Sequence, residues 1–229
     1  MKKIVFATLT GMATLALFAF ALPEGGFEGV ITYNMSFSAS GDGGQGAGAM
    51  QQNNSRLVYI KGDKVRAEVN NSMFKQVTIG DRKTKEEITL ITTADGSKYE
   101  IKPDPTKVKP GTEERPEIKY LDSTKVIAGY TCKAADITVT GKTGEKNSVI
   151  VFYTDQLPYS EDMGQYKGLK GCLMQFGVKF GQTNITIVAQ SAERKALSDT
   201  LFTIPAKGYK IYNSREEMMK DMQKQGGGY

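Results

Sequence analysis

The feature that most constrains the fold is a succession of short segments in which apolar and polar residues alternate. The first one sets the pattern, with Phe27, Gly29, Ile31, Tyr33, Met35 and Phe37 on one face and Glu28, Thr32, Asn34 and Ser36 on the other. A period of two indicates a β-strand that is buried on one side only. We therefore expect a fold built around a sheet with one covered face.

Turn signals separate these segments and predict hairpins. Lys61-Gly62-Asp63 lies between RLVYI and KVRAEV, and Asp95-Gly96 precedes SKYEIK. Glycine and aspartate accept the positive φ angles that tight turns need. Further segments at residues 125–140, 148–154 and 172–195 bring the expected total to about ten antiparallel strands. Residues 149–152 are apolar on both faces, which predicts a strand covered on both sides.

Two polar stretches interrupt this pattern. Residues 38–55, SASGDGGQGAGAMQQNNS, hold too few apolar side chains to order themselves, so we expect a flexible Gly-rich loop. Residues 102–117 contain four of the seven prolines, which favours an exposed connector because proline cannot donate to a β-ladder. Neither flank of this connector has enough strands to close a core alone. Residues 22–213 are therefore expected to form a single domain.

Residues 214–229 carry the one clear helical signal. Ser214 and Glu217 have the spacing of a capping box, and Met218, Met219 and Met222 form a stripe over the following turns. A Gly-rich tail ends the chain. The expected class is mainly β (α+β), with one or two helices.

Residues 1–21 predict export. Lys2 and Lys3 precede an apolar run, and Ala19-Phe20-Ala21 places small residues where a signal peptidase reads them. A transmembrane anchor is the alternative, because the run approaches the shortest length that spans a bilayer. The cleavage site and the helix-breaking residues 23–26 favour a signal peptide. We expect a periplasmic or secreted protein that has no transmembrane anchor after cleavage.

Composition excludes several function classes. The chain has no histidine, so no imidazole base and no Ser-His-Asp or Cys-His arrangement is available. It has no C-x-x-C, no phosphate-binding glycine loop and no G-x-S-x-G. Carboxylate-only or Ser-Lys catalysis would depend on placements that spacing does not reveal. We expect no enzyme, no cofactor and no metal site.

Charge argues against nucleic acid as a partner. The 30 basic and 25 acidic residues are interleaved along the chain. A nucleic-acid-binding protein normally shows a stripe of positive charge.

The two cysteines, Cys132 and Cys172, have two readings. Neither has the helix N-terminus, histidine or adjacent thiol that lowers a thiol pKa, which argues against a thiol redox protein. An even pair behind a signal peptide favours a disulfide. A disulfide between them would close a loop of about forty residues and would stabilise the folded chain by roughly 4 kcal/mol in the chain-entropy model. Two separately buried free thiols are the alternative, because cysteine packs as a small hydrophobe.

One apolar row combines two of the predicted strands and is the candidate ligand-binding surface. It consists of Ile31, Tyr33, Met35, Phe37, Met174, Phe176 and Val178. The simplest interpretation is core. A curved sheet under one short helix would instead leave part of this lining open to an acyl chain, and methionine suits such a surface because it adapts its shape.

Six motifs, in order, resemble a known family: FEGVITY, YIKGDKVRAEV, KVIAGYTCKAADI, VFYTDQLP, GLKGCLMQF and FTIPAKGY. The chain resembles the secreted domain-of-unknown-function family 4412 and its relative, the GLPGLI family. Gly168, Leu169 and Gly171 match the naming motif of the latter, whereas Lys170 and Cys172 replace its proline and second leucine, which makes the former the better fit. The resemblance implies a fold similar to the LolA/LolB carriers, a curved, incompletely closed antiparallel half-barrel with helices over its mouth. It supplies no catalytic residue.

The leading expectation is therefore a non-enzymatic envelope protein that binds a hydrophobic or lipidic ligand in the concave face of its sheet. The alternative is a structural or protein-interaction component of the envelope whose core is filled. In that case the loop at 38–55 and the methionine stripe would contact protein partners.

Overall fold

The computed structural model describes residues 26–39, 55–71, 74–103, 116–140, 144–158, 164–180, 183–205 and 207–226. The predicted signal peptide at 1–21 lies outside the described residues. So do positions 40–54 of the predicted loop, 104–115 of the predicted connector and 227–229 of the predicted tail.

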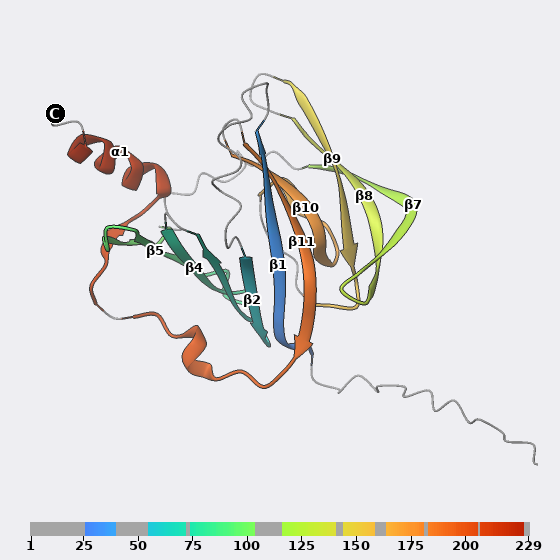
Figure 1. Cartoon of the computed structure of the whole chain (residues 1–229), viewed down its shortest axis with the longest axis horizontal. Coiled ribbons are helices and arrows are strands. Elements are labelled where there is room, and N and C mark those ends of the chain that lie inside the picture. The colour runs from blue at the N-terminus through green and yellow to red at the C-terminus, as the bar shows by residue number, and fades with distance from the viewer. Residues whose placement is uncertain are drawn as a thin grey trace, which may run out of the picture.

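Within this part of the chain, twelve strands form one sheet (Figure 1). They are β1 (Glu28–Ala39), β2 (Ser55–Lys61), β3 (Lys64–Asn70), β4 (Phe74–Asp81), β5 (Glu87–Thr93), β6 (Lys98–Ile101), β7 (Glu117–Ile127), β8 (Tyr130–Thr140), β9 (Lys146–Thr154), β10 (Cys172–Phe180), β11 (Thr183–Arg194) and β12 (Lys210–Tyr212). Their order across the sheet is β12-β6-β5-β4-β3-β2-β1-β11-β10-β9-β8-β7. The sheet curves but does not close into a barrel, which confirms the predicted mainly β class and open architecture.

One α-helix and two 3-10 turns accompany the sheet in the described residues: α1 (Arg215–Gly226), η2 (Gly164–Tyr166) and η3 (Asp199–Phe202). Ser214 caps α1 through its Oγ, which accepts from the Glu217 amide at 3.1 Å. The Glu217 carboxylate in turn accepts from the Asn213 amide at 2.9 Å. The predicted capping residues therefore lie at the N-terminus of α1, as expected. Among the described residues, no helix is both long and apolar enough to cross a bilayer.

The predicted hairpin turns are confirmed. Lys61 pairs with Lys64 across a two-residue turn in which Gly62 has a φ of 57°. Gly96, with a φ of 85°, lies between β5 and β6. Residues 125–140, expected as one segment, contain a further turn: Ile127 pairs with Tyr130, and Ala128 adopts a φ of 50°. Gly129, with a φ of 82°, is the turn signal that was missed, because it stands inside an otherwise strand-like segment.

The last described strand departs from the expected antiparallel order. Residues 195–205 and 207–209, here called the C-terminal return, run along the outer face of the sheet, so that β12 pairs parallel with β6. This return is tied to the sheet by Lys61 Nζ, which donates to the Leu197 carbonyl at 2.7 Å, and by Arg66 Nη1, which donates to the Leu201 carbonyl at 2.8 Å. Tyr209 packs on the apolar outer face of β4 and β5.

The main core lies on the concave face of β1, β2 and β8 to β11. The connection between β9 and β10 covers it. We call the described parts of this connection, residues 155–158 and 164–171, the strap. Only the inner face of β9 is covered, because Val151 is fully buried whereas Ile150 on the outer face is 56% exposed. The prediction of a strand covered on both sides is therefore wrong.

Candidate functional site

The structure places the predicted ligand-binding row in the main core. Four of its members, Ile31, Tyr33, Met174 and Phe176, are at most 2% exposed. Met35 and Val178 are partly buried against the same core. Phe37 is half-buried near the end of β1. Six of the seven residues lie in or against this core, and the central part of the row has no open surface.

The strap covers this row. The Tyr166 ring meets Phe176 edge-on with centroids 5.8 Å apart, and its hydroxyl donates to the Gly177 carbonyl. Gln165 Nε2 donates to the same carbonyl at 3.0 Å. On the sheet side, the Tyr33 hydroxyl donates to the Leu173 carbonyl at 3.0 Å. Burial raises the pKa of the Tyr166 hydroxyl, which therefore acts as a neutral donor.

The predicted disulfide is not present. Cys132 and Cys172 are free and fully buried. Cys132 lies in β8 and Cys172 in β10, with β9 between them. Two strand spacings place their Cα atoms about 9.5 Å apart, beyond the span of about 7 Å that a disulfide bridges. The arrangement is the alternative one, two separately buried thiols.

Neither thiol is activated. Burial raises the pKa of the Cys172 thiol to about 12, although a contact with the Tyr33 hydroxyl at 3.7 Å partly offsets it. Burial also raises the pKa of the Cys132 thiol. A thiol with a raised pKa is a poor nucleophile and a poor metal ligand. In the described residues no group of three or more Cys, Asp or Glu side chains is placed to hold a metal ion.

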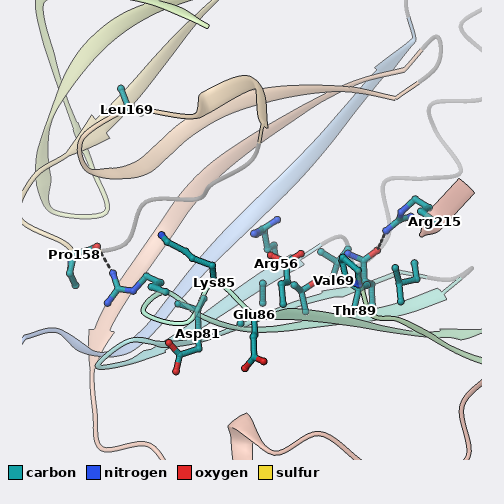
Figure 2. Close-up of a pocket in the computed structure, with 18 of the residues that line it drawn as sticks. Arg56, Val69, Asp81, Lys85, Glu86, Thr89, Pro158, Leu169 and Arg215 are labelled. Atoms are coloured by element: carbon teal, nitrogen blue, oxygen red, sulfur yellow. Dashed lines mark hydrogen bonds between the residues drawn. The ribbon is translucent and has the colours of Figure 1, made fainter. Parts of the chain in front are cut away.

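An open groove of about 920 Å³ lies beside the covered row (Figure 2). Its floor is the concave face of β2 to β5, and the strap forms the facing wall. Cross-strand pairing aligns the floor residues in rows, because paired residues point to the same side of a sheet. The rows are Arg56-Val69-Gln76, Ala67-Thr78-Thr89-Ile101 and Val65-Gly80-Glu87. Pro158, Gly168, Leu169 and Lys170 line it from the strap.

The lining combines apolar and polar groups. Val65, Ala67 and Leu169 supply apolar surface from both walls. In the middle of the floor, the Thr78 and Thr89 hydroxyls contact each other at 3.2 Å. At one border, Arg215 Nη2 donates to Gln76 Oε1 at 2.7 Å. Such a lining suits an amphipathic molecule better than a purely apolar one.

Arg82 holds the strap against the floor. Its Nη1 donates to the Pro158 carbonyl at 2.6 Å (Figure 2), and its Nη2 donates to the Gly62 carbonyl at 2.5 Å. The strap and the β2–β3 turn are thereby joined through one side chain from the β4–β5 turn.

Sequence reasoning missed the groove. Its floor segments were expected as hairpins, and the sequence analysis gave Arg56, Thr78 and Thr89 no functional role. The available signal was weak: the face of β4 and β5 that carries Gln76, Thr78 and Thr89 is the polar one, and the opposite face holds the apolar Val77, Ile79, Ile88 and Leu90. The C-terminal return covers that apolar face, and the polar face on the concave side stays open as the floor of the groove.

Comparison with known proteins finds no matching family model and no matching curated protein. Among solved structures, the chain is similar to PNGF-II, with 19% identity and a TM-score of 0.49 over 85% of this chain and 33% of that one. It thus spans about a third of the PNGF-II chain. The lipoprotein LppX of Mycobacterium tuberculosis shows 8% identity and a TM-score of 0.34, over 75% of this chain and 90% of that one. LprF of Mycobacterium bovis shows 10% identity and a TM-score of 0.30, over 74% and 88%. Membership of family 4412 stays a prediction.

Proposed function

We propose that this chain is a non-enzymatic, exported protein that binds an amphipathic ligand of lipid type on the concave face of its sheet. The groove between β2–β5 and the strap is the observation that carries the proposal. Its volume of about 920 Å³ falls within the range of small-molecule sites, about 300 to 1,000 Å³. Export rests on the sequence pattern of residues 1–21.

We place the ligand in the groove and not on the predicted row. Ile31, Tyr33, Met174 and Phe176 lie on the same concave face, but the strap packs directly over them. A ligand that touched them would have to displace Tyr166 and Leu169. The groove offers apolar side chains without that displacement.

Filling the groove tests the proposal. Ala67 is half-buried at the centre of the floor, so Ala67→Trp places an indole where the ligand would lie. We expect this variant to weaken binding of decyl phosphate and decanol at least about tenfold, as measured by titration calorimetry. Lys75→Trp is the matched control, because Lys75 is exposed on the opposite side of the same sheet. Failure of both probes to bind the wild-type chain, or unchanged binding by Ala67→Trp, would refute the proposal.

The alternative function is an envelope interaction protein with a filled core. The burial of Ile31, Tyr33, Met174 and Phe176 under the strap favours it. Exposed apolar side chains near the C-terminal end, Ile211 and Met219, are its candidate contacts. Native mass spectrometry with lipid extraction separates the two functions, since only the ligand-binding protein retains a lipid after gentle purification.

A further inference from the structure

The groove lining carries an excess of positive charge. Five basic residues line it, namely Arg56, Arg82, Lys85, Lys170 and Arg215, against the acidic Asp81, Glu86 and Glu87. Arg56 and Lys85 rise from the floor toward the strap, whereas the carboxylates of Asp81 and Glu86 point to the other side of the sheet (Figure 2). Of the three lining acids only Glu87, which lies in a floor row, is on the groove side, so the charge that faces a ligand is more positive than the count of lining residues indicates.

Asp81 is occupied by its own turn. Its Oδ1 accepts from the amides of Lys83 at 2.8 Å and Thr84 at 3.0 Å. The backbone amides of Thr84 and Lys83 lower the pKa of this carboxyl, so it stays ionised while it caps the β4–β5 turn. It does not neutralise the cations on the groove side.

Lys85 is placed at a structural cost. It adopts a φ of 64°, a left-handed conformation that a lysine rarely takes. Its amide donates to the Asp81 carbonyl at 2.8 Å, which closes the turn and holds the side chain beside the groove. Among the described residues no carboxylate forms an ion pair with its ammonium group. A strained, exposed cation at a groove is a feature of binding sites.

We infer that the ligand of the groove carries an anionic group, a carboxylate or a phosphate, which Arg56 and Lys85 bind while the apolar lining holds its alkyl part. This inference rests on the proposed function and adds the chemistry of the head group. Guanidinium and ammonium groups form charge-assisted hydrogen bonds with such oxygens, and these are stronger than bonds between neutral partners.

Matched probes test the head group. We expect decyl phosphate to bind at least about tenfold more tightly than decanol, which has the same alkyl chain without the charge. Raising the salt concentration from about 0.05 to about 0.5 M should weaken only decyl phosphate, because salt screens the ionic contact. Inorganic phosphate alone should bind far more weakly than decyl phosphate.

Single substitutions assign the cations. Lys85→Asn removes the charge, and asparagine accepts the left-handed conformation. We expect it to lower the ratio of decyl phosphate to decanol affinity about three- to tenfold, and Arg56→Gln to act in the same direction. The matched control is Lys83→Asn, since Lys83 is exposed on the same turn but does not line the groove. The ratio of the two affinities is insensitive to a folding defect, because such a defect would weaken the binding of both probes equally.

The outcomes are distinguishable. Equal affinity for the two decyl probes, or a ratio that neither Lys85→Asn nor Arg56→Gln lowers, overturns the anionic head group and leaves the amphipathic groove standing. Inorganic phosphate binding as tightly as decyl phosphate overturns the role of the alkyl part. Failure of both decyl probes overturns the proposed function itself.

Discussion

Burial decides the chemistry of the two cysteines. Both were candidates for a disulfide because they follow a predicted signal peptide. In the structure β9 separates them, and each thiol is enclosed by apolar neighbours. Cys172 also touches the Tyr33 hydroxyl, which belongs to the packing under the strap. Their role in the folded chain is that of small core residues.

Alkylation checks this role. With a pKa of about 12, the Cys172 thiol is ionised in roughly one molecule in ten thousand near pH 8, and it is also inaccessible. We therefore expect iodoacetamide to modify neither cysteine in the native protein and both in the denatured, unreduced protein, as read by intact-mass measurement. Absence of labelling after denaturation without reductant would show a disulfide and contradict the strand order around β9.

The strap is the element that divides the concave face. It converts the apolar row of β1 and β10 into core and, at the same time, supplies one wall of the groove. Its hold depends on the Tyr166 contacts with Phe176 and Gly177 and on the Arg82 bridge to Pro158. Loss of these contacts would expose the predicted row and widen the groove together.

Substitution of Tyr166 measures the strength of this hold. Tyr166→Phe removes one hydrogen bond and should lower the free energy of unfolding by about 1 kcal/mol, because Gln165 still donates to the Gly177 carbonyl. Tyr166→Ala also leaves a cavity and should cost about 3 to 5 kcal/mol. The control is Tyr120→Phe, at a ring that is 52% exposed, and urea denaturation is the measurement. Equal effects of the two Phe variants would show that the strap adds nothing to stability.

At the scale of the whole molecule, the C-terminal return completes the sheet. Its residues 195–205 and 207–209 lie over the outer apolar face, β12 extends the sheet beside β6, and α1 closes that end (Figure 1). Met218 packs with Ile91, Ile101 and Tyr212 in a separate small core, and Met222 packs against it. Two of the three methionines predicted as a stripe therefore dock the helix.

The two adjacent methionines of α1 provide a matched test. Met218 is 4% exposed and Met219 is 47% exposed. We expect Met218→Ala to lower the free energy of unfolding by about 2 to 5 kcal/mol, because it leaves a cavity between α1 and the sheet. Met219→Ala should stay within about 0.5 kcal/mol of the wild type. Thermal unfolding followed by circular dichroism reads both, and similar shifts would mean that α1 does not dock through Met218.

Local pattern predicted the strands and most of the turns. Alternation in β1, the glycines at 62 and 96 and the cap at Ser214 each act over a few residues, so single-sequence reasoning finds them. The turn at Ala128-Gly129 and the parallel pairing of β12 escaped it. Gly129 carries an ordinary turn signal but stands inside an otherwise strand-like segment, and β12 pairs with a strand about a hundred residues away in the sequence. The predicted row and the groove lie on the same concave face, and no local pattern separates its covered part from its open part.

The amino-acid sequence by itself determined that this chain forms a mainly β fold, that its thiols lack activating neighbours, and that imidazole chemistry is absent, because these depend on residue types and on contacts a few positions apart. Tertiary structure alone decided which part of the concave face is core and which is open. The strap buries one row, the C-terminal return covers the opposite side of β4 and β5, and both choices are contacts between distant segments. The groove with Arg56 and Lys85 exists only where those coverings leave the sheet exposed.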